Sequence, residues 1–174
     1  MSKTSKKHHG STSHKPRKAT AADWISGARI RTLPLAFAPV AIGSGAAAIT
    51  DQFKAPVALL CLVVALALQI GVNYSNDYSD GIRGTDNYRV GPARLTGSGA
   101  ADPKKVLAVA LAFFALSAVA GIIIVILTAA WWMLAVGAVA IVAAWFYTGC
   151  RRPSGYAGLG EVMVFIFFGL VATV

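Results

Sequence analysis

The residues best suited to chemistry are concentrated in one stretch of the chain, residues 73–96. Three of the seven acidic residues, Asp77, Asp80 and Asp86, occur there together with Asn76. On a helix, Asn76 and Asp80 are four residues apart and share a face. Carboxylate and amide oxygens suit a hard cation such as Mg²⁺, which keeps coordination positions for phosphate oxygens. The pattern predicts a metal site formed by Asn76, Asp80 and Asp86, with Asp77, Asp80 and Asp86 as candidate catalytic carboxylates.

Basic residues accompany these acids. Arg83, Arg89 and Arg94 follow at six- and five-residue spacing and are predicted to bind a diphosphate that the metal also contacts. The alternative interpretation is a solvated, helix-capping loop whose arginines only set membrane topology. The clustered acids favour the metal–diphosphate interpretation, because ionisable groups at a membrane edge tend to be functional.

The rest of the chain has the composition of a membrane protein. It is 56% hydrophobic and 13% charged, which excludes an ordinary soluble enzyme and a disordered chain. Two cysteines are too few for a disulfide scaffold. The uncharged runs are long enough for membrane-spanning helices, and the longest, residues 106–150, holds two helices with a turn at 128–132. The predicted fold is all-α: a polytopic bundle with four full helices at 33–50, 56–75, 106–127 and 131–148, and a truncated fifth after Glu161.

Two local signals refine these helices. The helix from residue 56 is expected to continue through the polar stretch, which holds no proline before Pro92, with Gly81 and Gly84 loosening it. Asp102, followed by proline, predicts the N-cap of the third helix. Gln69 and Asn73 allow two interpretations: hydrogen bonds to other helices, or the lining of a cavity.

The basic residues predict how the chain lies in the membrane. Fifteen of the 16 lysines and arginines fall on one side of the predicted spans, and only Lys54 falls on the other. The positive-inside bias predicts that the N-terminus lies in the cytoplasm. The protein is expected to be a multi-pass protein of the plasma membrane. Residues 1–22 are predicted to be a disordered basic tail that attracts the lipid bilayer rather than nucleic acid, and residues 23–174 to form the membrane domain.

The polar stretch resembles a known motif. Residues 76–80, Asn-Asp-Tyr-Ser-Asp, are similar to the first aspartate-rich motif of the UbiA superfamily of intramembrane aromatic prenyltransferases. The longer string 76–95 resembles the menaquinone-pathway branch of that superfamily, and so do residues 27–34, 147–149 and 158–161.

This resemblance implies a bundle of eight or nine helices in which two aspartate-rich motifs hold Mg²⁺ against a polyprenyl diphosphate. The implied reaction transfers the polyprenyl group to 1,4-dihydroxy-2-naphthoate, giving demethylmenaquinone with loss of CO2 and diphosphate. Asn76, Asp77 and Asp80 match the motif, and Arg94 matches the arginine that follows it. Asp86 stands two residues later than in many relatives. No acidic residue follows Glu161, so the chain is expected to be an N-terminal half, inactive alone.

Two alternatives remain open beside this interpretation, and a third does not fit the sequence. One alternative stays within the superfamily and assigns another aromatic acceptor, such as 4-hydroxybenzoate or homogentisate. The other takes the chain as a non-catalytic membrane subunit, which explains the helices but not the acidic cluster. CDP-alcohol phosphotransferases also use membrane aspartates, but residues 80–83, Asp-Gly-Ile-Arg, do not fit their pattern.

Overall fold

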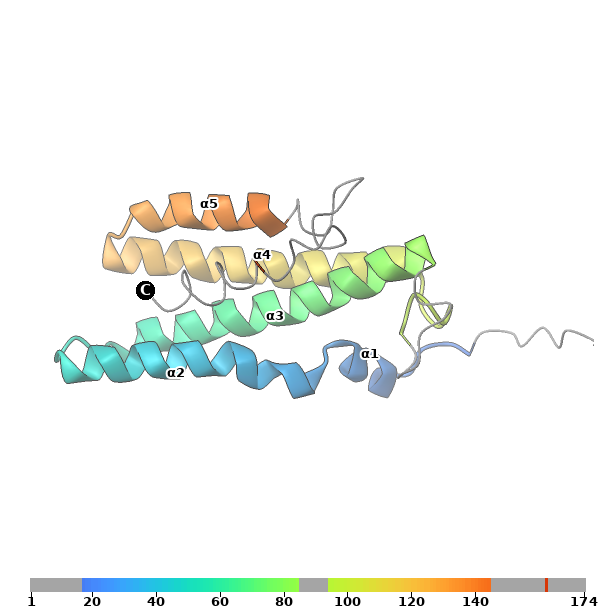
Figure 1. The fold of residues 1–174 in the computed structure, drawn as a ribbon, viewed down its shortest axis with the longest axis horizontal. Coiled ribbons are helices and arrows are strands. Elements are labelled where there is room, and N and C mark those ends of the chain that lie inside the picture. Colours follow the sequence, from blue (N-terminus) through green and yellow to red (C-terminus); the bar gives the residue numbers. More distant parts are fainter. Residues whose placement is uncertain (1–16, 85–93, 145–161, 163–174) are drawn as a thin grey trace, which may run out of the picture.

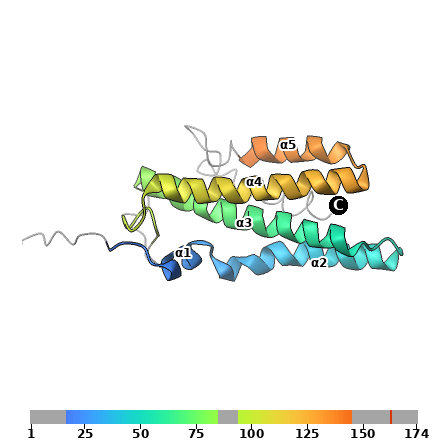
Figure 2. The ribbon, with the colours of Figure 1, turned by 180° about the vertical axis from the view of Figure 1, so that it is seen from behind.

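The computed structural model describes residues 17–84, 94–144 and 162. The described residues form helices and no strands. Figure 1 shows α2, α3, α4 and α5 side by side in chain order, with their axes along the long dimension of the bundle, and Figure 2 shows the same arrangement from behind. The elements are α1 (Ala21–Gly27), the 3-10 helix η1 (Ile30–Thr32), α2 (Leu33–Ile49), α3 (Ala55–Arg83), α4 (Pro103–Thr128) and α5 (Trp132–Ala144).

Three segments of the described part of the chain are long and apolar enough to cross a membrane. They are Ala21–Ile49 with 29 residues, Ala55–Arg83 with 29 and Pro103–Thr128 with 26. At about 1.5 Å per residue, α3 and α4 each exceed the roughly 30 Å thickness of the hydrocarbon core. Ala21–Ile49 combines α1, η1 and α2. Large apolar side chains such as Leu59, Leu111 and Ile126 are exposed along these helices, as expected for surfaces that face lipid. The prediction of an all-α polytopic bundle is confirmed.

The boundaries of the helices agree with the sequence pattern, with one instructive difference. α2 and α4 match the predicted spans to within a few residues, and Asp102 caps α4 by accepting a hydrogen bond from the Lys104 amide at 2.9 Å. α3 continues past residue 75, as predicted, but it ends at Arg83, with Gly84 as its C-cap, rather than before Pro92. Gly84 adopts φ 71°, the left-handed conformation in which glycine commonly ends a helix.

The last two predicted helices are described only in part. α4 ends at Thr128, Ala129 takes φ 54°, and α5 begins at Trp132, which confirms the predicted turn. α5 is described as far as Ala144. The rest of that helix, and the predicted fifth helix except Val162, lie outside the described residues.

A short segment before α2 was not predicted as helix. Thr20 and Asp23 form a capping box at the start of α1, and Arg17 pairs with Asp23 at 3.0 Å. The Ala19 amide also donates to the Ala100 carbonyl at 2.9 Å. The predicted boundary between tail and domain at residue 22 therefore falls inside α1.

The most extensive helix–helix contact in the described structure lies between α3 and α4. The buried cluster consists of Tyr74, Leu95, Val106 and Ala110, and Phe114 packs against it. Gly71 permits this contact, because a Cβ there would lie 2.7 Å from the Phe114 ring. Small residues that allow helices to approach closely are typical of membrane bundles, where van der Waals contact drives association. This packing fixes the C-terminal part of α3, which carries the polar motif.

Candidate metal and diphosphate site

The site is built on the last two turns of α3. The same end of the bundle also holds α1, the start of α4 and the segment that runs from residue 94 to α4 (Figure 1). Most of the described lysines and arginines are at this end, whereas Lys54 is at the opposite end, in the turn between α2 and α3. A positive end of this kind suits an anionic ligand.

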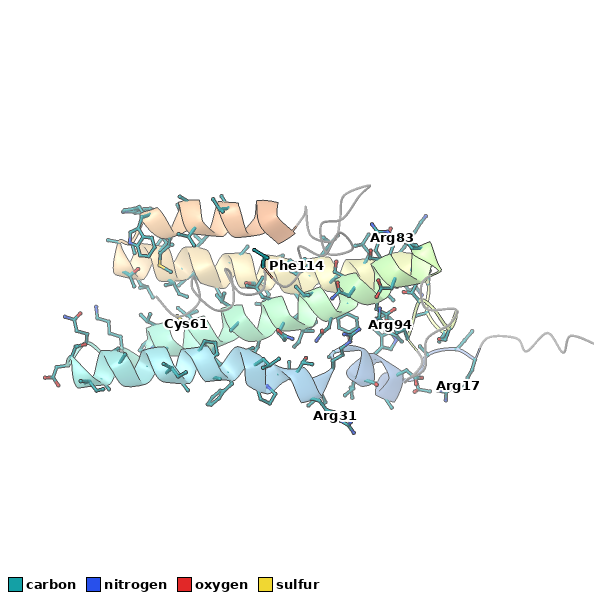
Figure 3. All side chains as sticks on the ribbon, viewed as in Figure 1. Arg17, Arg31, Cys61, Arg83, Arg94 and Phe114 are labelled. Atoms are coloured by element: carbon teal, nitrogen blue, oxygen red, sulfur yellow. The ribbon has the colours of Figure 1, made fainter. Side chains whose placement is uncertain are left out.

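Arg94 and Asp80 form an ion pair at the centre of the site. The Nη1 atom of Arg94 donates to the Asp80 carboxylate and also to the backbone carbonyl of Asn76, at 3.2 Å. The Arg94 side chain is 10% exposed and that of Asp80 is 22% exposed. Figure 3 shows Arg94 beside the C-terminal part of α3. The pair joins two residues that the sequence analysis assigned to diphosphate and metal.

Asp77 has a different environment, although it adjoins Asn76. It is 3% exposed, and its two carboxylate oxygens accept hydrogen bonds from the backbone amides of Leu95 at 3.0 Å and Thr96 at 2.8 Å. Both contacts join α3 to a segment nearly twenty residues further along the chain. The carboxylate of Asp77 therefore binds protein backbone within the described structure.

Gly81 lies one turn beyond Asp77 and touches the same segment. A Cβ at this position would lie 2.3 Å from Thr96 Cγ2 and 3.0 Å from the Gly97 amide nitrogen. The residue is inside α3, so it does not loosen the helix as predicted. Its missing side chain instead lets residues 95–97 approach the helix.

A second layer of polar contacts holds α1 and its connection to α2 against α3. The Asn73 amide donates to the Ala28 carbonyl at 2.9 Å and to Thr32 Oγ1 at 3.2 Å. The Tyr74 hydroxyl donates to the Trp24 carbonyl at 2.6 Å. Of the two interpretations of Asn73, hydrogen bonding to a neighbouring element is the one the structure shows.

The remaining predicted site residues divide into two groups. Arg83 ends α3 and is exposed, and Figure 3 shows it apart from Arg94. Asp86 and Arg89 lie outside the described residues. The sequence analysis missed the backbone amides of Leu95 and Thr96 and the contact at Gly81. No local pattern points to the amides, whereas a glycine inside a helix can signal close packing.

The described residues fit a cation only in part. Among them, no group of three His, Cys, Asp or Glu side chains is close enough to hold a metal ion. Asn76 and Asp80 nevertheless place an amide oxygen and a carboxylate one turn apart on α3. Because Mg²⁺ is usually held by one or two carboxylates together with phosphate oxygens and water, this donor set suits Mg²⁺ bound with a phosphate ligand.

Comparison with known proteins identifies the family to which the chain belongs. The UbiA prenyltransferase family matches residues 36–174. The chain is 58% identical over 154 residues to a 1,4-dihydroxy-2-naphthoate octaprenyltransferase of Mycobacterium tuberculosis, covering 88% of this chain and 52% of that protein. It is 38% identical to the Escherichia coli protein of the same name, covering 84% and 49%.

A relative with a different name is also similar. A 2-carboxy-1,4-naphthoquinone phytyltransferase of Synechocystis is 30% identical, with 88% of this chain and 50% of that protein covered. The chain spans about half the length of the curated relatives it matches. No solved structure gives a significant match. The family match covers most of the chain, including all of α3 and α4, and the chain therefore belongs to the UbiA prenyltransferase family.

Proposed function

We propose that this chain supplies a diphosphate- and Mg²⁺-binding half-site for polyprenyl transfer to 1,4-dihydroxy-2-naphthoate. The observation that carries the proposal is the ion pair of Arg94 and Asp80 beside Asn76, at the positive end of an apolar bundle. The names of the relatives support a naphthoate acceptor and a prenyl donor. A polyprenyl diphosphate matches both features, because its tail is apolar and its headgroup is anionic.

The roles of the side chains follow from their chemistry. Arg94 binds a diphosphate oxygen through a charge-assisted hydrogen bond, while Asn76 and Asp80 hold Mg²⁺. When bound, Mg²⁺ offsets the negative charge that builds up on the diphosphate as it leaves. Because Arg94 is nearly buried, its attraction for that charge is less screened than at a fully exposed position.

The proposed reaction is an electrophilic substitution. The allylic C–O bond breaks, and its electron pair leaves with the diphosphate. An electron-rich carbon of the naphthoate ring then forms a bond to the allylic carbon. Loss of CO2 from the attacked carbon returns an electron pair to the ring, which gives the reduced form of demethylmenaquinone. Apolar helices favour this course because they keep water away from the allylic cation.

A prenyl-transfer assay tests this proposal. It uses membranes that contain the protein expressed from its complete reading frame. Membranes supplied with a polyprenyl diphosphate, 1,4-dihydroxy-2-naphthoate and Mg²⁺ are expected to release CO2 and diphosphate in equal amounts, and EDTA is expected to stop the reaction. Preferential prenylation of 4-hydroxybenzoate or homogentisate would overturn the assigned acceptor. No prenylation of any acceptor would indicate a non-catalytic subunit.

We further propose that the end carrying Arg94 faces the cytoplasm, with the protein in the plasma membrane. The charge asymmetry supports this orientation. Single cysteines at Ser98 and Gln52, both exposed and at opposite ends of the bundle, give a direct test once the native cysteines, among them Cys61 and Cys150, are replaced by serine. In intact cells, a membrane-impermeant thiol reagent is expected to label Gln52→Cys and to spare Ser98→Cys. The reverse pattern would contradict the orientation.

A further inference from the structure

We propose that Asp77 is a positioning residue: its carboxylate fixes the backbone of Leu95 and Thr96 on α3 and thereby sets Arg94 against Asp80. This inference rests on the proposed function for the meaning of that pair, but its contacts are independent of any ligand. The inference gives two acids of one motif different roles. Asp80 is the acid proposed to contact the ligand, whereas Asp77 acts through the backbone of Leu95 and Thr96.

The first argument is the environment of the Asp77 carboxylate. Each of its oxygens accepts one backbone amide, and the residue is 3% exposed. Hydrogen bonds from amides to a carboxylate are stronger than those between neutral groups. Turning this carboxylate toward a metal would leave two buried amides without their acceptor, which is costly. Asp77 is therefore suited to hold protein rather than metal.

The second argument is that the held segment fits α3 closely on either side of Asp77. Leu95 is 3% exposed and packs in the cluster with Tyr74, one turn before Asp77. Gly81, one turn after it, leaves the space that Thr96 occupies. Contacts at three residues spread over about two turns of one helix thus determine where residues 95 and 96 lie. The position of the segment is fixed by shape as well as by hydrogen bonds.

The third argument is the consequence for Arg94. This residue precedes Leu95 directly, so fixing the Leu95 amide also fixes the start of the Arg94 side chain. From there the guanidinium group reaches the Asn76 carbonyl and the Asp80 carboxylate, one residue before Asp77 and three residues after it. Arg94 is thus placed in advance of any anion, which reduces the cost of ordering a long side chain when the anion binds.

Hydrogen exchange and chemical modification test this inference without an activity assay. In the protein from the complete reading frame, Asp77→Asn replaces one acceptor oxygen by an amide NH2. Exchange of the Leu95 and Thr96 amides, followed by mass spectrometry, is expected to be about tenfold faster in this variant. Modification of the Arg94 guanidinium by phenylglyoxal is also expected to increase. Asp80→Asn, one turn further along α3, is the matched control and is expected to leave exchange at residues 95 and 96 unchanged.

Gly81→Ala provides a second route to the same effect without altering any carboxylate. Its added Cβ displaces Thr96, so Arg94 is expected to become more reactive in this variant as well. This variant keeps the inference testable if Asp77→Asn does not fold.

Kinetics separate positioning from metal binding. In Asp77→Asn, KM for the prenyl diphosphate is expected to rise about tenfold, while the Mg²⁺ concentration that gives half-maximal activity stays unchanged. A shifted Mg²⁺ requirement with unaltered exchange at Leu95 and Thr96 would overturn the inference, because Asp77 would then be a ligand. If exchange and Arg94 reactivity change as expected but no prenyl transfer occurs, the positioning role stands and the proposed function fails.

Discussion

The two ends of α3 are held in place by different physical means. Its first half, from Ala55 to Leu68, is apolar and contains the buried Ala67, and the Val64 carbonyl accepts a hydrogen bond from the Ser117 hydroxyl of α4 at 3.3 Å. Its second half carries side chains that bind backbone groups of other elements: Asn73, Tyr74 and Asp77. One half is exposed mainly through hydrophobic side chains, whereas the other buries an amide and a carboxylate.

This difference shows where the fold carries function. An apolar helix in lipid gains little from the hydrophobic effect when it packs on another helix, so close contact of small residues suffices. Buried polar groups are expensive unless they are satisfied, and the structure satisfies those of α3 at the end where Arg94 meets Asp80. The polar end therefore depends on particular side chains, while the apolar end is expected to tolerate other apolar residues of similar volume.

The largest effect is expected from removing the Asp80 charge. Asp80→Asn is expected to lower kcat/KM for prenyl transfer about 10²–10³-fold, because both Mg²⁺ and Arg94 lose their carboxylate partner. Yield in the membrane is expected to stay the same. Asp102→Asn makes the same charge change at the cap of α4 and serves as the control. Equal activity of the two variants would remove Asp80 from the site.

Loss of Arg94 is expected to have the next largest effect. Arg94→Ala is expected to raise KM for the prenyl diphosphate about 10–100-fold, since one charge-assisted contact to the leaving group disappears. KM for the aromatic acceptor is expected to change little. Arg31→Ala, at the same end of the bundle but exposed, controls for the general positive field. An effect confined to the acceptor would refute the assignment.

At the junction of the two halves, a steric change is expected to affect stability rather than chemistry. Gly71→Ala puts a Cβ 2.7 Å from the Phe114 ring and is expected to destabilise the protein by about 1–3 kcal/mol. Gly121→Ala, in α4, has no atom within 4 Å of the new Cβ and is the matched control. Thermal unfolding in detergent measures both variants. A lower melting temperature for Gly121→Ala than for Gly71→Ala would contradict the described packing.

The smallest effect is expected at Thr96. Its side-chain hydroxyl is buried and makes no hydrogen bond within the described part of the chain, whereas its methyl group faces Gly81. Thr96→Val keeps the shape and removes the hydroxyl, so the unfolding free energy is expected to change by less than about 1 kcal/mol. Thermal unfolding checks this, and a marked loss of stability would show that the hydroxyl has a partner that matters.

The sequence predicted much of the fold and less of the site. The hydrophobic runs predicted the positions of the helices, and Asp102 predicted the start of α4, because both signals are local in the sequence. α1 was missed since it has only seven residues next to a basic tail, although Thr20 and Asp23 form its capping box. A capping box at the edge of a polar segment would have been the signal for it.

The sequence analysis predicted the same catalytic role for Asp77 and Asp80, whereas the structure gives the two carboxylates different partners. Helical spacing correctly places Asn76 and Asp80 one turn apart, and Arg94 does reach Asp80. Periodicity contains no information about the backbone amides that Asp77 binds, because that contact depends on the path of the chain between α3 and α4. The metal and diphosphate roles of all these residues remain predictions, and Asp86 and Arg89 lie outside the described residues.

Mg²⁺-dependent binding of a prenyl diphosphate tests the central claim most directly. In isothermal titration calorimetry of the purified protein, produced from its complete reading frame, we expect binding that EDTA abolishes and that Asp80→Asn weakens at least about tenfold. Asp102→Asn is expected to bind as the wild type does. Equal binding by wild type and Asp80→Asn, with Mg²⁺ and with EDTA, would contradict a metal–diphosphate site at the end of α3.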